Sequence, residues 1–315
     1  MTAVPPEDSG LPTGQPRKIP WLRWAGTLLA LGLLVYLLIN EGWAALAQAL
    51  EQISWGAFLL AFALTLLSRF ATVGRWHTLL RSADVPITLR QSTRLVFAGL
   101  FAANFLPTTV GGDVVRLAWV IRLGCDQAVS LASLVADRLV GMAGMAMALP
   151  FGLPGYLRYV QGLNQSPTAG LVALPWLRSL QEKLAGFTRR LLGALQIWLH
   201  KPRSLLASLA FTWVHMLCTF GMVWLLLTGM GEHISFWMVM GLWSATYFVT
   251  LLPISVNGMG VQELAMSFFY TAIGGISAPS GLTLALLMRL IQMLASLPGA
   301  LFLPQILAGK RQSEA

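Results

Sequence analysis

The sequence predicts an all-α polytopic membrane protein with roughly six to eight membrane segments. Its composition is the first reason, because 56% of the 315 residues are hydrophobic and 10% are charged, whereas about a quarter of a soluble domain is charged. The second reason is a set of apolar stretches of bilayer length, and the third is a pair of similar apolar segments that proline and glycine interrupt. The chain is basic, with 21 Lys and Arg against 12 Asp and Glu. In a membrane protein this surplus indicates orientation, and no nucleic-acid partner is needed to explain it.

The chain divides into two short tails and one membrane domain. Residues 1–16 are rich in Pro, Gly, Ser and acidic residues, and we expect a disordered tail because they cannot bury enough apolar surface to fold. Residues 17–309 form the membrane domain, and residues 310–315 form a short cytoplasmic tail. Uninterrupted spans are expected at residues 25–39, 55–75, 128–149, 205–227 and 282–306. The first span resembles a signal peptide, but its basic flank lies far from the N-terminus, so we interpret it as uncleaved.

The stretch at about residues 178–203 has a different pattern. Its apolar residues recur every three or four positions with basic residues between them, which is typical of an amphipathic helix. Such a helix lies on the membrane surface or packs on the protein's own cytoplasmic face. The sequence leaves both alternatives open.

The basic residues predict how the chain is oriented in a bacterial-type inner membrane. The basic residues before position 25 place the N-terminus in the cytoplasm, and Lys310 and Arg311 place the C-terminus there too. The loop at residues 40–53 has two glutamates and no Lys or Arg, so we expect it outside. An odd number of uninterrupted spans cannot put both ends on one side. Either residues 95–122 cross fully while residues 236–276 enter and return, or both segments enter and return and a further crossing lies in residues 151–176.

Those two segments contain similar breaks. The first reads Leu-Pro-Thr-Thr-Val-Gly-Gly-Asp from residue 106, and the second reads Leu-Pro-Ile-Ser-Val-Asn-Gly from residue 252, with Glu263 following. Each half is too short to span a bilayer, and irregular backbone is tolerated there only where it is buried in protein or lines a watery cavity. Paired breaks of this kind indicate a transporter binding site near the midplane. A pair of kinked helices is the alternative.

Six charged side chains lie within or beside the apolar segments, namely Asp113, Arg116, Asp137, Arg138, Glu263 and Arg289. Left unpaired, each would cost about 3 kcal/mol, and the sum of about 18 kcal/mol exceeds a typical folding stability of about 5 to 15 kcal/mol. We therefore expect them to be paired or hydrated in a central polar cluster. Arg69 and Arg75 are interpreted as reaching the cytoplasmic interface. The histidines and the two cysteines are too scattered for a metal site or a disulfide, so no metal and no cofactor is expected.

At these residues the sequence resembles the family known as the transmembrane region of lysylphosphatidylglycerol synthase, or flippase-like integral membrane proteins. The positions that match its motifs are Asn104, Pro107, Gly112, Asp113 and Arg116, then Asp137 and Arg138, then Pro253, Asn257, Gly258, Gly260 and Glu263. The resemblance covers about residues 20–306. Aspartate replaces the family's glutamate at two of these positions, and residues 151–176 are shorter and more broken than the span usual in relatives. About ten residues follow the last span, so the soluble aminoacyl-transferring domain of the fused synthases is not expected.

The resemblance implies translocation of an anionic lipid or a lipid-linked headgroup, by flipping or scrambling. In this hypothesis arginines hold the headgroup charge, carboxylates neutralise them when the site is empty, and helix N-termini with nearby glycines bind the phosphate. The expected path comprises Asn104, Pro107, Gly111, Gly112, Asp113, Arg116, Asp137, Arg138, Pro253, Asn257, Gly258, Gly260, Glu263 and Arg289. The chain is then not an enzyme. The alternatives are a membrane enzyme acting on a lipid or polyprenyl phosphate, and a membrane scaffold for a separately encoded transferase that docks at residues 178–203.

Overall fold

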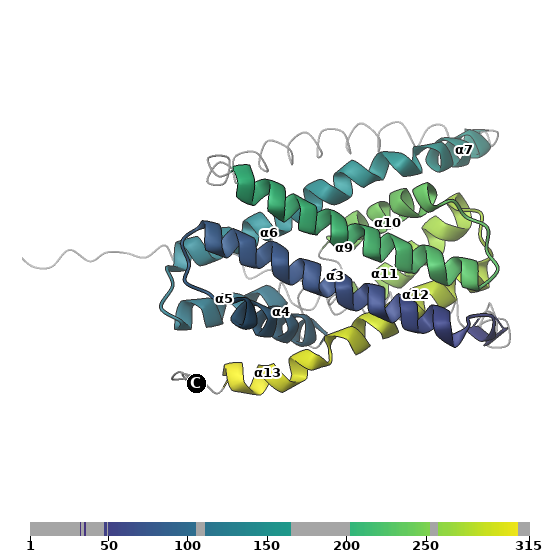
Figure 1. Cartoon of the computed structure of the whole chain (residues 1–315). Helices are drawn as coiled ribbons and strands as arrows, with labels where there is room; N and C mark the ends of the chain where they lie inside the picture. Colours follow the sequence, from purple (N-terminus) through teal and green to yellow (C-terminus); the bar gives the residue numbers. More distant parts are fainter. Residues whose placement is uncertain are drawn as a thin grey trace, which may run out of the picture.

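The computed structural model describes residues 50–104, 111–164, 202–252 and 258–307, together with positions 32, 35, 47 and 48. All regular structure in these residues is helical, which confirms the predicted all-α fold. In chain order the elements are α3 (Trp55–Ser82), α4 (Leu89–Ala103), α5 (Gly111–Arg122), α6 (Gln127–Ala148), η1 (Leu149–Gly152), α7 (Leu153–Asn164), α9 (Pro202–Gly229), α10 (Phe236–Thr250), α11 (Val261–Phe268), η3 (Phe269–Ile273), α12 (Ala278–Ser296) and α13 (Pro298–Leu307). Figure 1 shows them gathered into one bundle.

Several sequence predictions fall outside the described residues. These are the two tails, nearly all of the first span at residues 25–39, residues 178–201 of the amphipathic stretch, and three of the expected path residues, Pro107, Pro253 and Asn257. The last two residues of the amphipathic stretch belong to the first turn of α9.

Four helices in the described part of the chain are long and apolar enough to cross a membrane, and they are Trp55–Ser82, Gln127–Gly162, Pro202–Gly229 and Ala278–Phe302. They coincide with the four later spans predicted from the sequence. With 28 residues each, α3 and α9 extend about 42 Å at 1.5 Å per residue, more than the roughly 30 Å hydrocarbon core. The chain is a multi-pass membrane protein.

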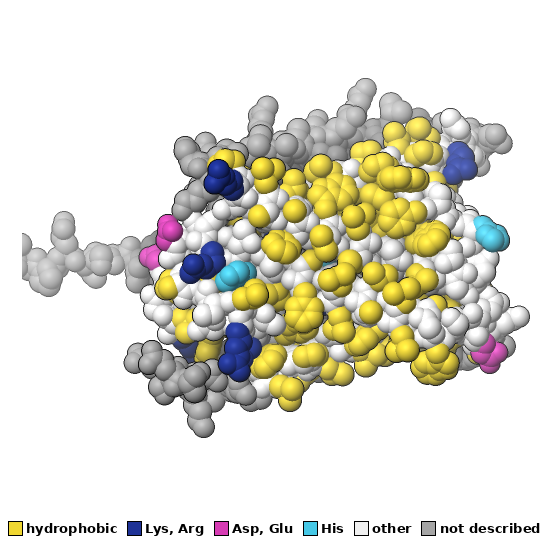
Figure 2. All heavy atoms as spheres, in the orientation of Figure 1, with side chains coloured by type: hydrophobic (Ala, Val, Ile, Leu, Met, Phe, Trp, Pro, Cys, Tyr) yellow, Lys and Arg dark blue, Asp and Glu magenta, His cyan; other side chains and the backbone are white. Residues whose placement is uncertain are grey.

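The outer surface of these helices is apolar. Trp55, Leu59, Leu206 and Leu301 are all more than half exposed. In Figure 2, hydrophobic side chains cover the middle of the visible face, and most of the visible Lys and Arg side chains lie near one end. A contiguous apolar surface of this kind is typical of a protein whose solvent is lipid.

Both segments broken by proline and glycine are pairs of helices, as predicted. α4 ends at Ala103 and α5 begins at Gly111, whereas α10 ends at Thr250 and α11 begins at Val261. The two halves of a kinked helix would run end to end without packing on each other, but α4 packs against α5 and α10 packs against α11. Each segment therefore turns back on itself as a hairpin.

The two hairpins open at opposite ends of the bundle. Val85 and Ile87, between α3 and α4, share an apolar cluster with Cys125, between α5 and α6, so the α4–α5 hairpin begins and ends at one end. At the other end, Glu232 between α9 and α10 accepts hydrogen bonds from the Ser277 amide at 3.1 Å and hydroxyl at 2.6 Å, just before α12. Figure 1 shows the two sets of connections at opposite ends.

The long helices do not all alternate in direction. A side chain on Gly229, the last residue of α9, would lie 3.8 Å from Ile53, which precedes α3. Leu205 in the first turn of α9 packs on a cluster that contains Leu79 from the last turn of α3 and Ala136 of α6. Helix α9 therefore runs antiparallel to α3. Further along α6, a Cβ on Gly144 would lie 2.7 Å from Thr212 and Met216, further along α9, so α6 runs in the same direction as α9.

Capping side chains start five of these helices, which explains where those helices begin. Their oxygens accept backbone N–H groups that would otherwise have no partner in the first turn, and the capping residues are Ser54, Thr88, Asp126, Ser235 and Ser277. Inside the bundle, α3, α4 and α5 share one apolar core around Trp76, Phe97 and Val120. A second core around Phe220 and Tyr270 joins α9 to α12. The two hairpins are thus each held against long helices by burial.

Candidate functional site

Five charged side chains, four of them buried, form one alternating chain across α3, α5 and α6. Asp137 accepts a hydrogen bond from Arg75 Nε at 2.6 Å, and its second oxygen lies 3.5 Å from Arg116 Nη2. Arg116 also pairs with Asp113, and the other oxygen of Asp113 pairs with Arg138 Nε. The order is therefore Arg75, Asp137, Arg116, Asp113, Arg138. We call these five residues the charge chain. Three arginines and two aspartates leave it with a formal charge of +1.

Most of this chain is shielded from solvent. The side chains of Arg75, Arg116, Asp113 and Asp137 are at most 11% exposed, whereas that of Arg138 is 35% exposed. The predicted pairing of these charges is therefore found, and Arg138 is the member that an incoming group would meet first. The guanidinium of Arg116 also lies over the Trp76 ring, 4.8 Å from its centre, which adds a cation–π contact.

Arg75 was expected at the cytoplasmic interface, and this expectation is wrong. Its side chain is turned into the bundle because Gly141 of α6 leaves room for it. A Cβ at that glycine would lie 3.1 Å from Arg75 Nη1. Pairing Arg75 with the buried Asp137 carboxylate is more favourable than hydrating the guanidinium at the interface, because Asp137 would otherwise stay unpaired in a medium of low dielectric constant.

A second charged pair lies on α11 and α12. Arg289 Nε donates to Glu263 Oε1 at 2.6 Å, and Arg289 Nη2 lies 3.4 Å from the carbonyl oxygen of Gly258. Glu263 Oε2 accepts the backbone N–H of Gly260 at 2.8 Å, so the same carboxylate also caps α11. Gly258 and Gly260 have φ of 70° and 76°, which only glycine adopts without strain. The six charges predicted to form one central cluster thus occupy two groups.

The glycines and the asparagine of the first hairpin have packing contacts. A Cβ on Gly112 would lie 2.4 Å from the carbonyl oxygen of Gly99, so this glycine lets α5 approach α4 closely. Gly111 is buried at the start of α5. Asn104 Nδ2 donates to Ser296 Oγ at 2.8 Å, which ties the end of α4 to the end of α12. The glycines were expected to let a phosphate approach the backbone, but at Gly112 the group that approaches closely is the backbone of α4.

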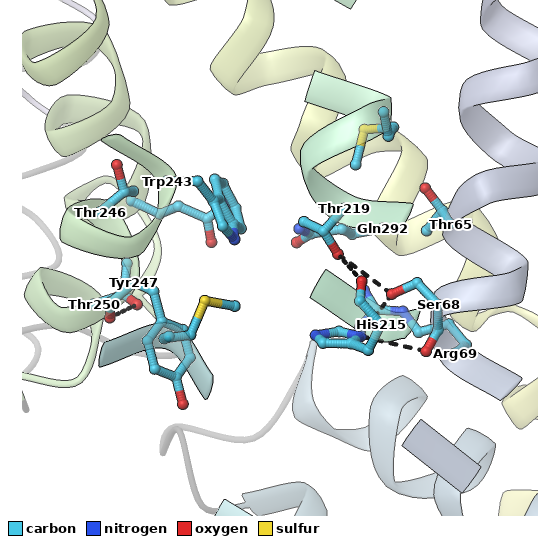
Figure 3. A pocket seen from close by; sticks show the side chains of 13 residues that line it. Thr65, Ser68, Arg69, His215, Thr219, Trp243, Thr246, Tyr247, Thr250 and Gln292 are labelled. Carbon is cyan, nitrogen blue, oxygen red and sulfur yellow. Dashed lines mark hydrogen bonds between the residues drawn. The ribbon is translucent and has the colours of Figure 1, made fainter. Parts of the chain in front are cut away.

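A cavity of about 210 Å³ lies between α3, α9 and α10, with side chains of α6, α11 and α12 also lining it. Figure 3 shows Trp243, Thr246, Tyr247 and Thr250 of α10 facing side chains of α3 and α9 across this space. On the facing side the polar side chains are Thr65, Ser68, Arg69, His215 and Thr219, and α11 and α12 contribute Gln262 and Gln292. His215 Nδ1 lies 2.6 Å from the Ser68 hydroxyl. We call this space the Arg69 cavity.

The Arg69 cavity is next to both charged groups. Gln262 precedes Glu263 directly, and Gln292 lies one helical turn after Arg289. On the opposite side, His215 Nδ1 lies 3.4 Å from the hydroxyl of Thr72, which is one helical turn before Arg75 of the charge chain. Arg69 was expected to reach the interface, but its Nε is buried and has no hydrogen-bond partner. That expectation is therefore also wrong.

The sequence analysis missed the contribution of α3 to the site, although a signal was present. Thr65, Ser68, Thr72 and Arg75 recur at three- and four-residue spacing, which places them on one face of a helix. A polar stripe on an apolar span indicates a face turned toward protein or water. Among the described residues no group of three or more His, Cys, Asp and Glu side chains could hold a metal ion.

The bundle of long apolar helices, two opposed hairpins and buried ion pairs defines a multi-pass integral membrane protein with a polar interior. Residues 23–299 match the family model of the lysylphosphatidylglycerol synthase TM region. Since the match covers most of the chain, the protein belongs to that family, and the suspected resemblance is confirmed. No curated protein matches the chain.

Proposed function

We propose that this chain moves an anionic lipid, or a lipid-linked anionic headgroup, between the leaflets of the inner membrane by flipping or scrambling. The observation that carries the proposal is the charge chain, which is buried, hydrogen-bonded and net positive. Such a set of charges is expensive in a bilayer and is found where it serves a polar path. A headgroup phosphate needs a path of this kind because hydrocarbon offers it no hydrogen bonds.

The proposal includes an internal inverted repeat. The first half consists of α3, the α4–α5 hairpin and α6, and the second consists of α9, the α10–α11 hairpin and α12. Two observations support it. The first is that the hairpins open at opposite ends. The second is that in each half an acid at the start of the second hairpin helix pairs with an arginine of the next span. Arg138 follows Asp113 by 25 residues, and Arg289 follows Glu263 by 26. Inverted repeats of broken helices meeting at the midplane are a recurring transporter design.

We propose that both hairpins enter the membrane and return. Because α6 and α9 run in the same direction, α9 begins on the side of the membrane on which α6 begins. The end of the bundle that carries Arg81, Arg90, Arg94, Arg122 and Arg203 is then cytoplasmic, because basic residues are retained on that side.

In this mechanism the ion pairs open in turn for the headgroup. Arg138 meets the phosphate first because it is the most exposed member of the charge chain. As the phosphate pairs with Arg138, Asp113 keeps Arg116, and Asp137 keeps Arg75, so no arginine is left without an anion. In the other half Glu263 holds Arg289 and the Gly260 amide, and a phosphate that displaced this carboxylate would find both donors in place at a helix N-terminus.

The test is a transbilayer assay with the purified chain in liposomes. Acyl-labelled fluorescent phosphatidylglycerol is placed in both leaflets, and an impermeant quencher reports how quickly inner-leaflet lipid becomes accessible. Losing a hydrogen bond between charged groups costs about 1.5–3 kcal/mol, so Arg138→Ala is expected to slow movement by roughly 10- to 100-fold. Glu263→Gln is expected to slow it as well, because Arg289 then lacks its carboxylate.

The matched controls are Arg90→Ala and Glu51→Gln, which remove the same charges from exposed positions. They should move lipid at the wild-type rate. If wild type transfers no more lipid than empty liposomes, or if Arg138→Ala and Glu263→Gln both transfer lipid as fast as wild type, the proposed function is wrong.

A further inference from the structure

Side chains around the Arg69 cavity carry hydrogen-bond donors that have no acceptor. Three of the residues that line it each have one buried nitrogen without a hydrogen-bond partner, and these atoms are Arg69 Nε, Trp243 Nε1 and Gln262 Nε2. All three are N–H donors. They come from three different helices, α3, α10 and α11, so helix packing brings them to one space. None of the described residues that line the cavity is Asp or Glu.

Arg69 differs from the other arginines inside the described part of the bundle. Arg75, Arg116, Arg138 and Arg289 each pair with a carboxylate. Among the described residues, no carboxylate pairs with Arg69. An arginine near the centre of a membrane helix is costly by about 2.5–3.5 kcal/mol even when it can adjust, and unpaired buried charges are strongly disfavoured. The cavity therefore lacks a negative charge that Arg69 could bind.

Water alone does not complete this site. A cavity of about 210 Å³ has room for roughly seven waters at about 30 Å³ each. Those waters could accept hydrogen bonds from Trp243 and Gln262, but they would leave the charge of Arg69 unbalanced. A group that only accepts hydrogen bonds and carries negative charge supplies both what the donors lack and the charge that Arg69 lacks.

We propose that the Arg69 cavity binds the oxyanion of a phosphate group, with Arg69 as the charge partner and the N–H groups of Trp243 and Gln262 as donors. The cavity volume accommodates a headgroup phosphate. The hydroxyls of Thr65, Thr219 and Thr246 also line it, and each already donates to a carbonyl oxygen of its own helix, so the free donors are those of Arg69, Trp243 and Gln262. The phosphate belongs to a lipid headgroup or to a free anion. The choice of an oxyanion depends only on the cavity, whereas the lipid source rests on the proposed function.

The position of the cavity fits a second holding site on the same path. It lies beside His215, whose Nδ1 is 3.4 Å from the hydroxyl of Thr72 one helical turn before Arg75, and beside Gln262, which adjoins Glu263. A phosphate leaving the charge chain would therefore reach another cation without entering hydrocarbon. Arg69 would then be a binding residue for the substrate.

Equilibrium binding to the full-length chain, delipidated in an uncharged detergent, tests this proposal. The melting temperature is followed as dioleoylphosphatidylglycerol, inorganic phosphate or dioleoylglycerol is added, since a ligand that binds only the folded state raises it. Phosphatidylglycerol and inorganic phosphate should both raise it, whereas dioleoylglycerol, which has no phosphate, should not. Arg69→Gln is expected to weaken the apparent Kd at least about tenfold, and Arg69→Lys less than that.

Two further variants make the result independent of folding defects. Trp243→Phe keeps an aromatic ring and removes only the indole N–H, and it should weaken both phosphate ligands by roughly threefold or more. Arg81→Gln removes an exposed charge from the last turn of the same helix and should bind as wild type does. The proposal is overturned if Arg69→Gln and Trp243→Phe both bind as tightly as wild type.

The arms also separate the two sources and the two proposals. Binding of inorganic phosphate alone that depends on Arg69 supports the oxyanion site and overturns the lipid source. A chain that binds phosphate through Arg69 but moves no lipid in the liposome assay keeps this inference and refutes the proposed function. A chain that moves lipid but binds phosphate independently of Arg69 and Trp243 keeps the proposed function and refutes this inference.

Discussion

Neutralising Asp137 is the perturbation that most strongly tests the charge chain as a structural unit. This carboxylate is 4% exposed and lies between Arg75 at 2.6 Å and Arg116 at 3.5 Å. In Asp137→Asn the amide occupies nearly the same volume, but Arg75 loses its charged partner while remaining buried. Removing one member of a buried ion pair typically costs about 3–5 kcal/mol.

The magnitude can be converted into a melting temperature. At about 2–4 °C for each kcal/mol in a chain of 150–250 residues, Asp137→Asn should melt roughly 6–20 °C below wild type in the same detergent. Asp126→Asn is the matched control, because it makes the same chemical change on the same helix at an N-cap, where Asn and Asp are about equally good. It should melt within about 2 °C of wild type.

A double variant separates the pair from the fold around it. If Asp137 acts mainly on Arg75, Arg75→Gln combined with Asp137→Asn should be less destabilised than the sum of the single variants by about 1–3 kcal/mol. An Asp137→Asn chain that melts like wild type, or single effects that simply add, would refute the interdependence of these charges.

Three further predictions concern packing, pH and topology. Gly112→Ala should lower the melting temperature through about 1–3 kcal/mol of overpacking, because its Cβ would lie 2.4 Å from a carbonyl oxygen of α4, whereas Gly162→Ala, with nothing within 4 Å, should not. Burial alone raises the pKa of Glu232, but hydrogen bonds from two serines near the start of α12 outweigh burial and lower that pKa. The ionised Glu232 therefore stabilises the fold above the ordinary pKa of about 4.3, and this stabilisation is lost as the pH falls through the lowered pKa. The melting temperature of wild type should therefore exceed that of Glu232→Gln near neutral pH and converge with it in acid, and a constant gap would contradict this. In a Cys218→Ala chain an impermeant maleimide should label Cys125 only after the cells are opened. Labelling should be slow, because burial raises the pKa of the Cys125 thiol. Labelling in intact cells would place the opening of the α4–α5 hairpin outside.

The breaks in the helices could be predicted from the sequence because their causes are local. Proline removes a backbone donor and glycine permits positive φ, so the ends of α4 and α10 and the beginnings of α5 and α11 follow from nearby residues. The pair Asp113 and Arg116 is also local, since residues three apart share a helix face. The positive φ of Gly258 and Gly260 agrees with the same reasoning.

The partners that lie far apart in sequence could not be predicted. Arg75 and Asp137 are 62 residues apart, and their contact depends on how α3 packs against α6, which composition and spacing do not specify. Arg69 raises the same difficulty, because a long arginine side chain can extend along the helix toward water or turn inward. The polar stripe on α3 indicates a face turned toward protein or water, but it does not reveal which residues of α9 and α10 lie opposite Arg69.

The most direct measurement of the central claim is the rate at which the purified chain moves phosphatidylglycerol between the leaflets of liposomes, compared with the rate for Arg138→Ala at equal protein content. The account predicts measurable movement by wild type, a rate roughly 10- to 100-fold lower for Arg138→Ala, and a wild-type rate for Arg90→Ala. Equal rates for wild type and Arg138→Ala, or no movement by wild type above that in empty liposomes, would contradict it.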